Sequence, residues 1–158
     1  MPRPTRVLLA VCACGWAAIA ASAQDRPAVV VRDATAFAGA MARIGEDWTI
    51  VDEAIAGPTY LLNSVRGDGL TRLDRMTDLL SGARTFLKER SRTDAATLVE
   101  TALQAVAALR IELTRAEPDQ AAAQEEAAYV REACAACHGR FREGDAATGY
   151  RFRPGVLD

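Results

Sequence analysis

Between residues 37 and 55, apolar residues recur at alternating steps of four and three, the spacing that marks one face of an α-helix. The series comprises Phe37, Met41, Ile44, Trp48, Val51 and Ile55. It predicts an amphipathic helix over residues 33–56, ended by Gly57 and Pro58. Pro58 and the Gly67-Asp68-Gly69 cluster are both helix breakers, so residues 58–69 are expected to form a loop.

Two more helices are predicted by the same spacing further along the chain. A leucine-rich series that begins at Leu70 predicts a second helix over residues 70–90. The third helix is expected to follow at once, with Ser91 or Thr93 as its N-cap and Asp94 complementing the helix dipole.

A fourth helix is predicted over residues 118–142. Pro118 ends the third helix and suits the first position of the next, where a backbone N–H is not needed, while Gly144 ends the fourth. No segment alternates with period two, so strands are not expected. The sequence therefore predicts an all-α fold, an antiparallel up-down-up-down four-helix bundle over residues 24–144 with an irregular tail over 145–158.

The N-terminus has the three parts of an export signal. Arg3 and Arg6 are followed by the apolar run VLLAVCACGWAAIA and by ASA, a pattern typical of a signal peptidase site. We expect residues 1–23 to be a cleaved signal peptide, leaving no membrane span and directing the protein to the periplasm. An uncleaved anchor helix and a lipoprotein signal at Cys14 are the alternatives.

Charge excludes one function class. The chain carries 19 basic and 21 acidic residues, and cleavage after residue 23 would remove two arginines and no acid, which moves the net charge from −2 to −4. A mildly acidic chain without a basic block does not predict nucleic-acid binding.

The segment CAACHGRFR, residues 134–142, concentrates the chemistry. It holds the only histidine and the two cysteines that remain after cleavage of the signal. Cys134, Cys137 and His138 stand at i, i+3 and i+4, so a helix would carry them on one face. C-x-x-C-H is the pattern for attachment of haem c, in which two thiols form thioethers and the adjacent imidazole binds iron. The cofactor predicted is one covalently bound haem c.

Three other uses of this segment were weighed. A structural zinc site needs a fourth ligand, and only a carboxylate could supply it here. A thioredoxin-like C-x-x-C belongs beside a βαβ unit, which the sequence does not predict. A disulfide between Cys134 and Cys137 would leave His138 without a role.

The second axial ligand of such an iron cannot be histidine, because His138 is the only one in the chain. The position is filled by a methionine, by an unusual ligand such as Lys88, or left empty. Met41 lies between Phe37 and Ile44 in the first helix, whereas Met76 shares its position with several leucines. Methionine suits haem iron, although packing is its commonest use.

These features resemble the class II cytochromes c, the cytochrome c′ family, which carry C-x-x-C-H near the C-terminus on the last helix of a four-helix bundle. CAACHGRFR is similar to the family's C-x-x-C-H-x-x-[YF]-R, with Phe141 at the aromatic position and Arg142 at the arginine near the proximal imidazole. Gly57 stands sixteen residues after Met41, and Gly45 four residues after it, as in the low-spin branch. The resemblance implies that Met41 is the distal ligand.

The function expected is electron transfer. With His138 and Met41 both bound to iron, a periplasmic cytochrome would exchange single electrons with redox partner proteins whose identity the sequence does not reveal. It is not expected to be an enzyme. Arg142 is expected near the haem, and a homodimer remains open. The alternative is a five-coordinate cytochrome c′ that binds nitric oxide or carbon monoxide.

Overall fold

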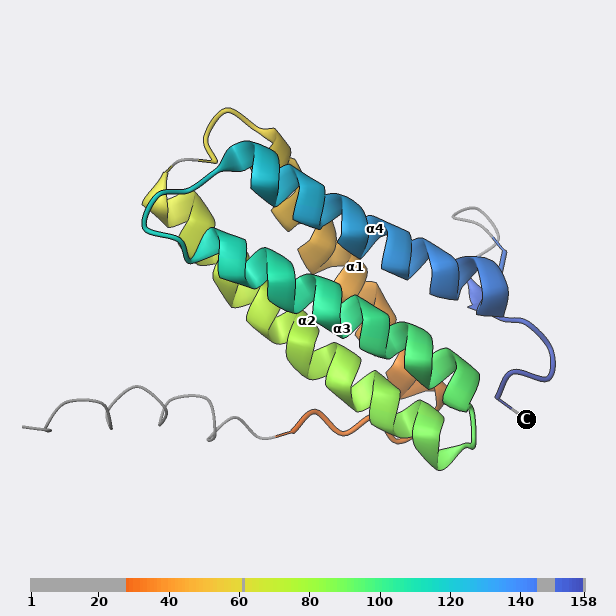
Figure 1. Ribbon diagram of the computed structural model, residues 1–158. Helices are drawn as coiled ribbons and strands as arrows, with labels where there is room; N and C mark the ends of the chain where they lie inside the picture. The colour runs from red at the N-terminus through yellow and green to blue at the C-terminus, as the bar shows by residue number, and fades with distance from the viewer. Residues whose placement is uncertain (1–27, 61, 145–149, 158) are drawn as a thin grey trace, which may run out of the picture.

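The computed structural model describes residues 28–60, 62–144 and 150–157 (Figure 1). Four long helices dominate this part of the chain, which confirms the predicted all-α fold. Among the described residues, no helix is long and apolar enough to cross a membrane. The predicted signal peptide lies outside them. The helices are α1 Ala34–Ala56, α2 Asn63–Glu89, α3 Thr93–Leu113 and α4 Gln120–Phe141, and two short strands are β1 Arg142–Glu143 and β2 Arg151–Phe152.

Helix α1 agrees with the sequence prediction. The Asp33 side chain accepts a hydrogen bond of 2.8 Å from the Ala36 backbone N–H, which satisfies one of the free donors of the first turn. The helix ends before Gly57, whose N–H donates to the Glu53 carbonyl oxygen. Of the predicted apolar series, four members are buried, while Met41 and Trp48 are half-buried.

Helix α2 begins seven residues earlier than predicted, so the expected loop over residues 58–69 is wrong in its second half. The two glycines do not break the helix, although each costs about 1 kcal/mol relative to alanine. Arg72 Nε donates to Asp68 at 2.8 Å, one turn back. A Cβ on Gly69 would lie 3.0 Å from Leu113 Cδ2, so this glycine lets α2 approach α3 closely.

The other predicted helix starts also need correction. The N-cap of α3 is Arg92, which makes no side-chain cap bond, while Ser91 turns the chain in the left-handed region with φ of 59°. Helix α4 begins two residues after Pro118, because the Asp119 carboxylate accepts from the N–H groups of Ala121 and Ala122. A side-chain cap therefore fixes the start of α4.

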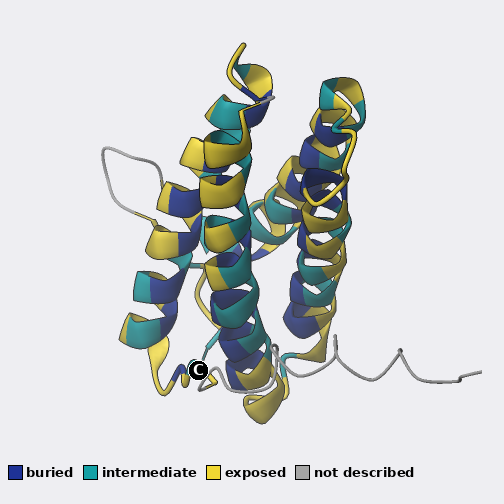
Figure 2. Ribbon diagram, turned by 90° about the vertical axis from the view of Figure 1, so that its left-hand side faces the viewer, coloured by how far each residue is buried: buried dark blue, intermediate teal, exposed yellow. Residues whose placement is uncertain are grey.

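Each helix packs against the next in the chain, and α4 also packs against α1 (Figure 1). Buried positions form inward-facing stripes along the helices (Figure 2). The helices contribute side chains of different size to the core. Helix α2 buries Leu73, Met76, Leu79, Leu80, Phe86 and Leu87, whereas α4 buries Ala123, Ala127, Val130, Ala133 and Phe141.

The tail is more ordered than predicted. Arg142 and Glu143 pair antiparallel with Phe152 and Arg151, respectively. The Phe152 ring packs on Phe37 of α1 with centroids 5.0 Å apart, a contact that no local pattern predicts. The C-terminal segment thus closes over the ends of α1 and α4.

Candidate functional site

The predicted attachment residues lie together near the end of α4. Cys134, Cys137 and His138 are all half-buried and project from neighbouring positions on one side of the helix. The buried residues one to three turns earlier on the same helix are small, namely Ala123, Ala127 and Val130. The inward face of α4 is therefore shallow beside the two thiols.

Both cysteines are free thiols in this structure, so no disulfide joins them. Burial raises the pKa of Cys134, and burial together with the neighbouring Cys134 and Asp94 raises the pKa of Cys137 to about 11. Both side chains are therefore protonated at neutral pH. Within the described ranges, no group of three or more histidine, cysteine or acidic residues could hold a metal ion, so the zinc alternative has no ligand set there.

His138 is held as a neutral imidazole. Burial lowers its pKa, and the positive charge of Arg142 lowers it further. The neutral ring is the form that binds iron. The main-chain carbonyl of His138 accepts a hydrogen bond from the Arg142 N–H at the end of α4, and this bond fixes the backbone at His138.

Three contacts define how α1 lies against α4. At the start of α4, Gln120 Nε2 donates to the carbonyl oxygens of Ile55 and Gly57, at 2.8 and 2.9 Å. In the middle, Arg131 pairs with Asp52. The contact between Phe37 and the tail is at the other end. The beginning of α1 therefore lies beside the end of α4.

Helical phase relates Met41 and His138 to the ion pair between these helices. Met41 is eleven residues before Asp52, which at 100° per residue puts both within about 20° on α1. His138 is seven residues after Arg131, which puts both within about 20° on α4. Asp52 and Arg131 form a partly exposed ion pair, so helical phase places Met41 and His138 on the flanks of α1 and α4 that carry this pair.

Axial distances agree with this placement. Measured from the Asp52–Arg131 pair, His138 lies about 10 Å along α4 and Met41 about 16 Å along α1, toward the same end of the molecule. The other sixth-ligand candidates differ in burial: Met76 is fully buried among the leucines of α2, and Lys88 is exposed at the C-terminal end of that helix.

Arg142 lies beside the site, half-buried in β1. Its guanidinium stacks over the Tyr150 ring, 3.7 Å from the centroid, and its charge acts on His138. Sequence reasoning missed the contribution of the tail. Arg153 donates to the carbonyl oxygens of Gly139 at 2.9 Å and Arg142 at 3.3 Å. The alternating aromatic and basic residues of YRFR, 150–153, were the available signal.

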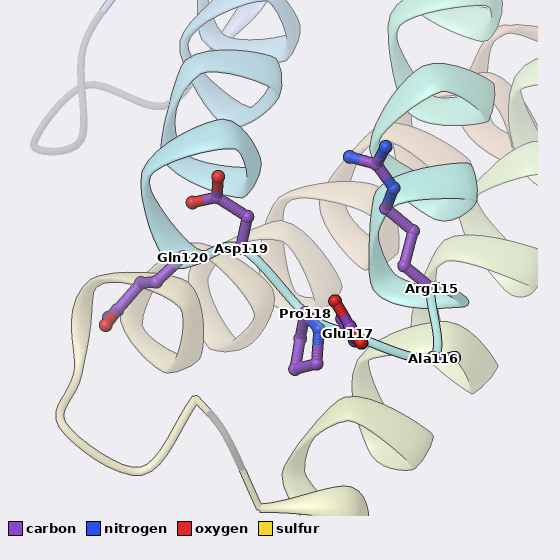
Figure 3. A pocket seen from close by; sticks show the side chains of 6 residues that line it. All are labelled: Arg115, Ala116, Glu117, Pro118, Asp119 and Gln120. Carbon is purple, nitrogen blue, oxygen red and sulfur yellow. The ribbon is translucent and has the colours of Figure 1, made fainter.

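The residues present fit haem c. Two protonated thiols with no disulfide between them, a neutral imidazole one residue further on, and an inward face of small side chains provide the donors that thioether attachment and iron ligation need. Figure 3 shows a separate hollow lined by residues 115–120 at the α3–α4 connection, at the opposite end of α4 from His138. Its lining includes none of the attachment residues.

Comparison with protein-family models, with curated proteins and with solved structures gives no match to this chain. Function is therefore inferred from the residues of the site.

Proposed function

We propose that this protein is a class II cytochrome c, an antiparallel up-down-up-down four-helix bundle that holds one haem c and transfers single electrons in the periplasm. The observation that carries the proposal is that Cys134, Cys137 and His138 lie together, half-buried, on one side of α4 near its C-terminal end. The contacts of α1 with Gln120, with Arg131 and with the C-terminal tail support an antiparallel arrangement of α1 and α4.

Each residue has a stated role. Cys134 and Cys137 would hold haem c through thioethers, and His138 and Met41 would bind its iron. When bound, haem c supplies the one-electron iron couple. Half-burial of His138 and Met41 restricts water at the ligands, and Arg142 adds positive charge beside the imidazole.

Met41 is favoured over the other candidates by its position. Met76 is completely buried in the α2 core, and Lys88 points into solvent. A filled sixth position leaves no open site for a gas ligand or a peroxide, so electron transfer is the remaining chemistry. With one histidine in the chain, no distal acid–base histidine is available for an enzymatic reaction.

Export and processing belong to the same proposal. We expect the mature protein to begin at Gln24, after removal of residues 1–23 in the periplasm. N-terminal sequencing of protein recovered from that compartment tests this, and a sequence beginning at Met1 would contradict it.

The proposal is tested on protein exported from a host that attaches haem c. We expect a coloured protein whose mass exceeds the polypeptide by one haem, with low-spin spectra in both oxidation states. Met41→Ala is expected to turn the spectrum high-spin and to permit rapid carbon monoxide binding, while the matched control Met76→Ala keeps the low-spin spectrum.

The outcomes separate the two candidate functions. A colourless protein with the mass of the bare polypeptide overturns the haem assignment. A coloured protein that binds carbon monoxide rapidly as wild type, with a spectrum unchanged in Met41→Ala, instead identifies a five-coordinate gas-binding cytochrome c′.

A further inference from the structure

Charge is unevenly distributed over the described residues. The end of the molecule that holds the attachment site is formed by residues 28–33, 88–94, 140–143 and 150–157, which we call the basic end. It has four acidic residues, Asp33, Glu89, Asp94 and Glu143, against eight basic ones, Arg32, Lys88, Arg90, Arg92, Arg140, Arg142, Arg151 and Arg153. The remaining described residues include eight basic and fourteen acidic side chains. Among the described residues, this end thus carries a net positive charge of four, whereas the full chain has a net charge of −2.

Contacts hold the segments of the basic end together. Arg90 donates to the Arg32 carbonyl oxygen at 3.3 Å, joining α2 to the segment before α1. Arg92 donates to the carbonyl oxygens of Gly155 and Val156, joining the start of α3 to the tail. These contacts hold the segments together at one end of the helices (Figure 1).

The acids of the basic end do not neutralise it. Asp94 is shared by Arg92 at 3.3 Å and Arg140 at 3.7 Å, and Glu143 is paired with Arg151. Even in these pairs, the side chains of Arg140 and Arg151 are 63% and 78% exposed. Their guanidinium groups remain available to carboxylates of another molecule.

The composition of this surface is typical of a protein interface. Seven of its eight cations are arginines, and Tyr150 and Val30 are exposed beside them. Arg142 is already stacked on Tyr150, which reduces the entropy that docking would cost. Arginine and tyrosine are enriched at protein–protein interfaces. The planar guanidinium of an arginine can bind both oxygens of a carboxylate in a fixed geometry.

We propose that the basic end is the docking surface for a redox partner whose contacting face is rich in aspartate and glutamate. This inference rests on the proposed function, because the surface surrounds the end of α4 just beyond His138. Its local charge is opposite to the net charge, so the partner is acidic although the protein itself is also acidic.

The test compares two double variants that lose the same charge. Arg140→Gln with Arg151→Gln changes the basic end, and Arg110→Gln with Arg115→Gln changes arginines that each pair with one acid elsewhere. The first readout is calorimetric binding of poly-L-glutamate to the full protein at low ionic strength. We expect the basic-end variant to bind about tenfold more weakly and the control to change by less than about twofold.

The second readout is electron transfer from the reduced protein to ferricyanide, which gains the electron and becomes ferrocyanide. Attraction by the basic end predicts a rate that falls as ionic strength rises, in wild type and control, with a weaker dependence in the basic-end variant. A rate that rises with ionic strength in wild type shows that the negative net charge dominates and overturns the proposal.

Other outcomes are equally decisive. Equal loss of poly-L-glutamate binding in both variants overturns the proposal, because no particular surface would be involved. Binding to phosphatidylglycerol vesicles but not to poly-L-glutamate or phosphatidylcholine vesicles identifies a membrane surface instead. A protein without haem overturns the proposed function, while the calorimetric comparison still reports on the basic end.

Discussion

Helix α1 meets its two neighbours in different ways. Toward α2 it buries Asp47, only 3% exposed, whose carboxylate accepts from Arg75 Nε at 2.6 Å and from Arg72 at 3.1 Å. The Phe37 ring contacts Phe86 of α2 with centroids 5.2 Å apart. This interface is closed by large side chains and by a hydrogen-bonded charge.

Toward α4 the same helix uses weaker contacts. Asp52 and Arg131 form a partly exposed ion pair, and Met41 and Trp48 are half-buried. Such pairs contribute about 0–1 kcal/mol. The difference teaches that α1 is anchored firmly on α2 and held more loosely on α4. The predictions below test this division of roles, from the largest expected effect to the smallest.

Removing a large side chain from the interface between α1 and α2 should lower the free energy of unfolding most. Phe86→Ala is expected to lower the free energy of unfolding by about 3–5 kcal/mol, because Phe86 is fully buried against Phe37. Denaturant unfolding of the exported protein measures this. Tyr129→Ala on α4, where the residue is 51% exposed, is the control and should cost less than about 0.5 kcal/mol. Similar losses in both variants would contradict the comparison.

The two aspartates of α1 provide a matched pair. Asp47→Ala leaves two arginines without their shared carboxylate and should lower the free energy of unfolding by about 2–4 kcal/mol. Asp52→Ala should cost at most about 1 kcal/mol, because its partner Arg131 is nearly half exposed. The same unfolding experiment measures both, and an equal cost would show that the α4 side is as firmly held.

Low pH should remove the contribution of Asp47 to the free energy of unfolding. Hydrogen bonding to Arg75 lowers the pKa of this carboxyl below its ordinary value of 3.8. The unfolded chain therefore takes up the proton first, so the stabilisation is complete above that value and is lost as pH falls through the lower folded-state pKa. The difference in unfolding free energy between wild type and Asp47→Asn should shrink between about pH 5 and about pH 2. A constant difference would contradict this cause.

Replacing two helix glycines by alanine should change the free energy of unfolding in opposite directions. A Cβ on Gly82 of α2 would lie 2.5 Å from the Val29 carbonyl oxygen, in the segment before α1, so Gly82→Ala should cost about 1–3 kcal/mol. Gly45 of α1 has no atom within 4 Å of such a Cβ. Gly45→Ala should therefore stabilise the helix by about 0.5–1 kcal/mol in thermal or denaturant unfolding. Destabilisation by Gly45→Ala would show that a close approach on this side requires the glycine.

The helices were predictable because many apolar positions share one period, and no single contact decides the pattern. The start of α2 at Asn63 differs from the prediction because Gly67 and Gly69 lie inside the helix and do not break it. Beside them are the Asp68–Arg72 pair and the close approach of Leu113, which are one local and one distant contact. The pairing of the tail with β1 depends on the distant Phe37 ring in the same way.

The grouping of Cys134, Cys137 and His138 on one side of α4 was predictable because the three residues are local in sequence. Choosing between the methionines needed the fold: periodicity puts both Met41 and Met76 on inward helix faces, and only packing shows that one is half-buried and the other fully enclosed. The basic end was not predictable from net charge, because it combines four segments that are far apart in the chain.

The contact between Phe37 and Phe152 joins the first helix to the last described strand, so it closes a loop of almost the whole described chain. A polypeptide that emerges from its N-terminus cannot make this contact until synthesis and export are nearly finished. Until then the end of α4 lacks the strand that covers it. We expect the pairing of β2 with β1 to be among the last steps of folding, after the four helices have packed.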